Sequence, residues 1–223
     1  MQRLDFLSTV PLFQGLSDRE LEALNSATSE RRFTTGQVVA GVEEDERSLY
    51  LVREGRIKIT KTSYAGKQQT LQIYGPGELV GLFSLFNGLP YPAAAVAMED
   101  CRVLVLSRRT LESTARRVPS LMVNLFQALS MRMNECMRTV ELLALKETPQ
   151  RLAACLLMES CGRNGSEAFV LSFSHREWAT LLGTTPETLS RTLKRLCCEG
   201  LISHQGRVIR ILDRRGLVRL YHG

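Results

Sequence analysis

The sequence predicts an α+β protein with an N-terminal jelly-roll β-barrel, a long dimerisation helix and a C-terminal winged helix-turn-helix. Three observations predict this class. Short β-rich runs broken by glycines fill residues 33–107, an apolar heptad stripe covers 122–143, and two short capped helices share a tight turn within 174–198. We therefore expect a barrel domain over 1–118, a dimerisation helix over 119–145 and a winged helix-turn-helix domain over 146–223.

The composition is that of an ordinary globular chain. Its 223 residues are 44% hydrophobic and 23% charged, which allows two small cores and excludes broad disorder. No run reaches the roughly 18 apolar residues that cross a membrane. The first ten residues carry Arg3 and Asp5 and no long apolar stretch. We therefore expect no signal peptide, no membrane partner and a cytoplasmic location.

The six cysteines show neither a CxxC pair nor zinc-type spacing. In a cytoplasmic chain the plain expectation is reduced and mostly buried thiols, although the adjacent pair leaves a redox role open. These cysteines are Cys101, Cys136, Cys155, Cys161, Cys197 and Cys198.

The net charge of +6 is concentrated in the last third of the chain. Residues 146–223 hold 12 basic and 7 acidic side chains, whereas residues 1–145 hold 17 and 16. A basic domain joined to a nearly neutral one indicates a polyanionic partner, although a basic solvated face is also common.

The predicted barrel follows a short helix within residues 11–30. Ser17 and Glu20 form a capping box for this helix, and Leu21 and Leu24 give it an apolar face. The β-rich runs that follow are short and closely spaced, which is typical of an antiparallel barrel that encloses a small ligand. The predicted strands are Val38–Val39, Leu49–Val52, Ile57–Ile59, Thr70–Tyr74 and Val103–Leu106.

Pro119 opens a long helix that reaches about Leu145. The apolar residues of its main stripe follow one another at alternating intervals of four and three positions, which is an unbroken heptad pattern; we call this stripe the seam. Because a second apolar stripe lies beside it, we expect one stripe to pack on the barrel domain and the other on a second copy. The alternative is a single helix buried in its own domain. The seam is Met122, Phe126, Leu129, Met133, Cys136, Val140 and Leu143, and the second stripe is Leu121, Leu125 and Ala128.

A hinge is expected at Lys146–Pro149, where Thr148 caps a new helix and Pro149 takes its first helical position. Residues 161–167 predict a loop and Val170–Phe173 a short strand. Ser174–Glu177 forms a capping box for the next helix, which ends at Gly183.

Thr185 caps the following helix, which begins at Pro186 and reaches about Cys198. Apolar residues occupy one face of this helix and polar residues the other. Two short helices joined by a glycine-containing turn are typical of a helix-turn-helix. The residues at core spacing are Leu189, Leu193 and Leu196. The outward residues Glu187, Ser190 and Arg191 are predicted to read bases, with Arg191 on guanine and Glu187 on a cytosine amino group. The alternative for Glu187 and Arg191 is an exposed ion pair.

A small hairpin, or wing, is predicted over Leu201–Leu212, with Gln205 and Gly206 at its turn. Hydroxyl and basic groups around the reading helix and the wing are expected to hold DNA phosphates, or else to be ordinary solvated side chains. The expected phosphate contacts are Thr184, Thr185, Lys194, Arg195 and Arg207.

Three segments, Tyr50–Ile59, Pro76–Gly81 and Leu182–Arg191, resemble the cyclic-AMP receptor protein/fumarate–nitrate regulator (CRP/FNR) superfamily of bacterial transcription factors. The resemblance covers nearly the whole chain. It implies a cyclic-nucleotide-binding-like barrel that senses an effector, a dimer helix and a DNA-reading winged helix-turn-helix. The implied partners are double-stranded DNA, a second copy of the chain, RNA polymerase and a small-molecule or gas effector.

The pattern of Glu187, Ser190 and Arg191 is similar to that of the fumarate–nitrate and nitric-oxide-responsive branches. Those branches read TTGA-type half-sites arranged as an inverted repeat, which a two-fold dimer would contact with two helices about one DNA turn apart. The apolar stretch Leu85–Ala97 is similar to the nitrosative-stress (DNR/HcpR-like) branch.

The resemblance also bears on the effector. Cyclic-nucleotide binders of the superfamily carry a Glu and an Arg-Ser or Arg-Thr pair where this chain has Leu82, Pro92 and Ala93, so we expect no cyclic AMP. No cysteine precedes Cys101, so we expect no iron–sulfur cluster. The expected effector pocket is Gly81, Leu82, Phe83, Pro92, Ala93 and Cys101.

Some relatives of the nitrosative-stress branch bind haem and respond to nitric oxide. The histidines of this chain, His175, His204 and His222, all lie in the DNA-reading part. An axial ligand in the barrel would therefore be Cys101, a methionine, a tyrosine or the N-terminus. The alternative for Cys101 is a buried strand thiol. Haem, a non-haem apolar or small anionic effector, and a redox effector are all left open.

Two other classes of function fit less well. A cupin-like enzyme needs a His/Glu metal cluster, and residues 33–107 contain no histidine. No G-x-S-x-G, P-loop or dinucleotide motif occurs either, so we expect no enzyme. A protein-interaction scaffold would need aromatic anchors, which the exposed face with Glu187, Ser190, Arg191 and Lys194 lacks.

Overall fold

The computed structural model describes residues 2–40, 48–66, 68–82, 93–161, 168–170 and 174–222. Its internal contacts divide the chain into two compact units, Met1–Glu135 and Cys136–Gly223. The first unit holds two four-stranded antiparallel sheets with helices, and the second holds helices with a three-stranded sheet. The predicted fold class is confirmed. The predicted hinge at Lys146–Pro149 lies inside the second unit.

The first unit alternates helices and short strands. Its helices are α1 (Arg3–Thr9), η1 (Pro11–Phe13), α2 (Asp18–Ser26), α4 (Arg108–Arg117) and the first part of α5 (Ser120–Leu145). Its strands are β1 (Ser29–Phe33), β2 (Val38–Ala40), β3 (Ser48–Glu54), β4 (Ile57–Thr62), β5 (Gln68–Tyr74), β6 (Leu79–Val80), β7 (Ala94–Ala97) and β8 (Cys101–Ser107).

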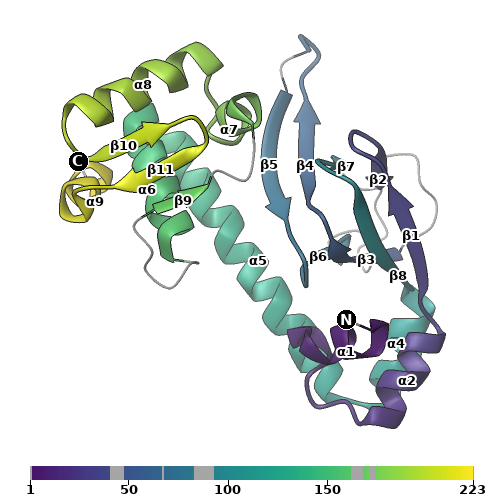
Figure 1. Cartoon of the computed structure of the whole chain (residues 1–223). Coiled ribbons are helices and arrows are strands. Elements are labelled where there is room, and N and C mark those ends of the chain that lie inside the picture. Colours follow the sequence, from purple (N-terminus) through teal and green to yellow (C-terminus); the bar gives the residue numbers. More distant parts are fainter. Residues whose placement is uncertain are drawn as a thin grey trace. The chain divides into compact units, whose positions relative to one another are not determined.

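Strands β3 and β8 of the sheet β1-β8-β3-β6 bury side chains on both faces. Since successive side chains of a strand point to opposite faces, Tyr50 and Val52 lie in the core shared with the sheet β2-β7-β4-β5. Leu49 and Leu51 point the other way, into a core formed with α1, α2, α4 and the start of α5. Figure 1 shows these helices gathered at one end of the unit. We call the two cores the barrel core and the helical core.

A capping box explains where the predicted helix α2 begins. Ser17 and Glu20 form the expected capping box of α2, and Ser17 N–H donates to Glu20 Oε2 over 2.8 Å. The predicted helix within residues 11–30 is shorter than that range, because a 3-10 turn precedes α2 and β1 follows it at Ser29.

α5 carries the two predicted stripes. Leu121 and Leu125 are buried in the helical core, with Ala128 and Leu129 packed against it. In the rest of the predicted seam Phe126 and Met133 are each 65% exposed and Val140 is 63% exposed, whereas Leu143 is half-buried. One apolar face of the helix is therefore covered within the chain and the other is not. No helix in the described part is long and apolar enough to span a membrane.

The second unit begins with the last turns of α5. Its other elements are α6 (Thr148–Cys161), β9 (Ala168–Val170), α7 (His175–Leu181), α8 (Pro186–Cys198), β10 (Ile202–Gln205), β11 (Val208–Ile211) and α9 (Arg214–His222). α6 packs against α9 and α8, and the strand order is β10-β11-β9. Thr148 is the first residue of α6 rather than its cap. The predicted strand Val170–Phe173 begins earlier, at Ala168, and residues 171–173 lie outside the described part, as does the loop predicted after Cys161.

Candidate functional site

The helix pair α7–α8 has the caps that the sequence predicts. Ser174 Oγ accepts from the Glu177 amide and the Glu177 carboxylate accepts from the Ser174 amide, which closes the capping box of α7. Gly183 takes φ of 63°, the left-handed conformation that turns the chain between the helices. Thr185 Oγ1 then accepts from the Thr188 amide and caps α8, with Pro186 in its first turn.

α8 is anchored by an apolar stripe. The residues that it buries are Leu189, Thr192, Leu193 and Leu196. Below them α7 contributes Trp178, which is fully buried and donates from Nε1 to the Cys155 sulfur over 3.2 Å. This packing holds α8 as a rigid element, so the side chains on its other face have a defined direction.

The opposite face of α8 holds all three predicted base-reading residues. Glu187 and Arg191 are exposed and Ser190 is partly exposed. Arg191 Nη2 donates to Thr188 Oγ1 over 3.2 Å, so this guanidinium keeps most of its donors free for a ligand. The pKa of Glu187 is lowered, first by hydrogen bonds from its own amide and from Thr185, with a smaller contribution from Arg191. Glu187 is thus an anion that can only accept hydrogen bonds.

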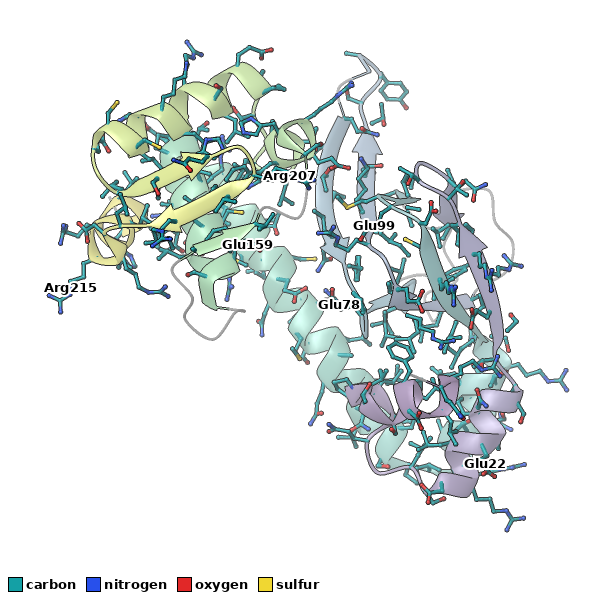
Figure 2. All side chains as sticks on the ribbon, viewed as in Figure 1. Glu22, Glu78, Glu99, Glu159, Arg207 and Arg215 are labelled. Carbon is teal, nitrogen blue, oxygen red and sulfur yellow. The ribbon has the colours of Figure 1, made fainter. Side chains whose placement is uncertain are left out.

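The predicted phosphate-binding residues surround this face. Thr185, Lys194 and Arg195 are exposed and Thr184 is partly exposed. Arg195 is not free, because its Nε lies 2.7 Å from Glu199 Oε1. Arg207 is exposed at the turn of the β10–β11 hairpin, where Gly206 has φ of 59°, and it is labelled in Figure 2. The predicted wing is present.

A basic hollow of about 530 Å³ lies beside α8. Arg151 of α6 lines it together with Arg191 and Arg195, and Glu147 is the acidic group of its lining. The excess of guanidinium groups on this side of the unit favours an anionic partner.

A pair of histidines that was not predicted lies between α7 and the wing. The ring centres of His175 and His204 lie 5.7 Å apart with 26° between the planes, and His175 meets the edge of Trp178. His204 Nε2 is buried and has no hydrogen-bond partner in the described residues. Burial, and then the charge of His204, lower the pKa of His175. This packing therefore favours the neutral form of His175.

We expect the second unit to lose thermal stability as the pH falls below about 6.5, the ordinary histidine value. Because the folded pKa of His175 is lowered, the unfolded chain binds the proton first, so protonation favours unfolding; above that pH both states are neutral and the effect vanishes. Melting temperatures between pH 7.5 and 5.5 measure this slope. His175→Phe, which keeps a ring and removes the titrating group, should flatten it, and His204→Phe should reduce it by a smaller amount, while His222→Asn should leave it. An unchanged slope in His175→Phe would rule His175 out as its source.

The structure brings only some of the predicted effector-pocket residues together in one core. Ala93 and Cys101 lie in the barrel core, whereas Leu82 lies in the helical core. Gly81 follows β6 with φ of 100°. Phe83 and Pro92 fall outside the described residues. The chain reverses faces between Val80 and Leu82, so residues close in sequence contribute to different cores.

Cys101 is a buried strand thiol. It is 2% exposed, and its sulfur lies 3.2 Å from the Arg56 carbonyl oxygen and 3.1 Å from that of Glu99. Burial raises the pKa of this thiol. Gly55 packs so closely that a Cβ there would stand 2.7 Å from the sulfur. In the described part of the chain, no three His, Cys, Asp or Glu side chains gather into a metal-binding group.

Two known domain families match the two units. Residues 30–117 match the cyclic nucleotide-binding domain, and residues 150–220 match the Crp-like helix-turn-helix domain. A cyclic AMP receptor protein of Thermus thermophilus is 34% identical over 192 residues, which cover 86% of this chain and 88% of that protein. An anaerobic regulatory protein of Haemophilus influenzae is 30% identical, with 92% and 81% covered. The structure of FixK2 from Bradyrhizobium japonicum is similar with a TM-score of 0.77 and 26% identity, covering 86% of this chain and 96% of that one.

Proposed function

Because the chain belongs to the CRP/FNR family of DNA-binding transcription regulators, we propose that it acts as a homodimer that reads an inverted repeat of TTGA-type half-sites. The observation that carries this proposal is the face of α8. Glu187, Ser190 and Arg191 form one accessible edge on a helix that is capped at its start and buried along its back. Their acceptor, hydroxyl and forked donor groups suit base edges in a major groove.

The heptad seam of α5 supports the dimer. Its exposed members are large and apolar, and an isolated chain would leave them in water. A parallel pair of α5 helices would cover them and would bring two α8 helices to one DNA duplex. Contact with RNA polymerase, a cytoplasmic location and membership of the nitrosative-stress branch stay predictions.

We propose that the effector is a small, uncharged, apolar molecule or gas that acts on the barrel core. That core is formed mostly by aliphatic and aromatic residues, and three arginines of the same unit, Arg53, Arg56 and Arg132, are paired with carboxylates. Cyclic AMP would need a Glu and an Arg where this chain has Leu82 and Pro92. We expect the effector to change the arrangement of α5 and so to raise DNA affinity.

Cys101 fits the role of an axial haem ligand poorly. The Cys101 thiol would have to leave two carbonyl partners and lose its proton in a site that disfavours the thiolate. We expect a haem titration of the purified protein to give non-saturating uptake with the same absorbance in Cys101→Ala. A saturable band of one haem per chain that shifts with nitric oxide under anaerobic conditions, and is lost in Cys101→Ala, would replace this effector proposal with haem.

A salt titration separates DNA readout from a protein-scaffold function. The affinity of a DNA reader falls steeply as salt rises, with a log–log slope of about −0.9 per phosphate contacted. Fluorescence anisotropy with a duplex that carries the inverted repeat measures this slope. A flat salt dependence, or equal affinity for shuffled DNA, would contradict the proposed function.

A further inference from the structure

A polar cluster joins α5 to strand β5 and to the turn that follows this strand. Arg132 Nη2 lies 3.0 Å from Glu78 Oε1, and Arg132 Nη1 lies 2.7 Å from Glu135 Oε2. The guanidinium also lies 4.3 Å from the centre of the Tyr74 ring, a cation–π distance. One side chain of α5 is thus held by three groups at once.

The partners of Arg132 are themselves held in place. Glu78, labelled in Figure 2, accepts from the Gly75 amide over 2.6 Å. Tyr74 Oη donates to Gln72 Oε1 over 2.9 Å, and the Gln72 amide donates to Glu135. We call Gln72, Tyr74, Glu78, Arg132 and Glu135 the α5 clamp. Its hydrogen bonds run from β5 to α5 and back, so neither element can shift without changing them.

Tyr74 connects this clamp to the barrel core. The residue is 7% exposed and packs in the same core as Ala93 and Cys101, while the guanidinium of Arg132 lies over its ring. A change of packing inside the barrel that moves Tyr74 therefore reaches Arg132 directly. Glu135 is the last residue of the first unit, and the same helix continues into the second.

We propose that Arg132 is a positioning residue that transmits the packing of the barrel core to α5 and hence to DNA affinity. The inference rests on the proposed function, since it concerns how the barrel controls DNA binding. A guanidinium held by two carboxylates and a ring has few alternative geometries. A movement of Tyr74 or Glu78 therefore moves Arg132, and α5 with it, instead of being taken up by a change of side-chain rotamer. A flexible apolar contact at this position would not transmit the movement.

A double-mutant cycle tests the proposal without an identified effector. Val103→Ala removes two methyl groups from a fully buried position of the barrel core. We expect it to change the Kd for the inverted repeat by roughly 3- to 30-fold in the wild-type background. In the Arg132→Met background the same change should alter Kd less than about twofold, because the connection is lost. Arg109→Met, an exposed cation of the same unit outside the clamp, should preserve the full effect.

The outcomes separate this inference from the proposed function. Equal effects of Val103→Ala with and without Arg132, or no effect in either background, would overturn the inference while specific DNA binding by the wild type still stands. Failure of the wild type to prefer the repeat over shuffled DNA would instead overturn the proposed function. Circular dichroism confirms that each variant is folded, and Glu78→Gln, which weakens the clamp from the β5–β6 turn, replaces Arg132→Met if that variant does not fold.

Discussion

Arg191→Ala is expected to weaken binding to the inverted repeat by about 1–3 kcal/mol per half-site while leaving binding to random DNA nearly unchanged. Arg191 is exposed, and its one hydrogen bond in the described structure goes to Thr188, so its removal does not disturb the core of α8. The loss comes from the two hydrogen bonds that a guanidinium makes to O6 and N7 of guanine. Anisotropy titrations with specific and shuffled duplexes measure both affinities.

Lys194→Ala is the matched control for this prediction. Lys194 is also exposed on α8 but is expected to contact a phosphate, so its loss should weaken both duplexes equally and reduce the salt slope by about one. If Arg191→Ala behaved in the same way as Lys194→Ala, Arg191 would be a phosphate contact and the assignment of base readout would be wrong.

Phe126→Glu is expected to convert the dimer to a monomer and to lower affinity for the full inverted repeat by roughly a hundredfold or more. Phe126 is 65% exposed on the seam of α5, so the chain itself loses little packing. In the dimer the carboxylate would lie in an apolar interface without a partner. The two half-sites would then be bound independently, without the gain in effective concentration that a dimer provides.

Light scattering after size exclusion measures the mass of this variant. Gln127→Glu adds a similar charge one residue away, at an exposed position off the seam, and should remain dimeric with near-normal affinity. A Phe126→Glu protein that stayed dimeric would place the interface elsewhere on the chain.

Local rules made much of the DNA-reading unit predictable. The caps of α7 and α8 depend on Ser174, Glu177 and Thr185, which act on amides three residues away. The division of α8 into a buried and an open face follows from the helical period alone. The helical period also separated the buried Leu121 and Leu125 of α5 from the exposed Phe126, Met133 and Val140. Leu129 is a correction: the prediction put it on the open seam, but it packs against the helical core.

Elements with few buried apolar residues were missed. α4 buries only Leu111 and Ala115 among its charged residues, and β1, Ser29–Phe33, has no buried residue at all. α1 and α9 were also not predicted. β7 is an alanine-rich run, which sequence rules favour as helix, and its strand form comes from pairing with β2 and β4.

The sites that depend on tertiary structure could not be read from sequence. Arg132 and Glu78 are 54 residues apart, and their contact exists only because α5 returns along β5. His175 and His204 meet only when the wing folds back on α7. The predicted effector pocket was wrong in one respect: the resemblance to cyclic-nucleotide binders placed Leu82 beside Ala93, but the chain reverses faces at Gly81 and Leu82 lies in the helical core.

Selection of bound duplexes from a random DNA pool tests the central claim most directly. The experiment uses the purified full chain at low salt, where a weakly binding effector-free dimer still engages DNA. The account predicts enrichment of an inverted repeat whose TTGA-type half-sites are about 10 base pairs apart, centre to centre, or a multiple of that spacing. Enrichment of a single unpaired half-site, or no enrichment at all, would contradict it.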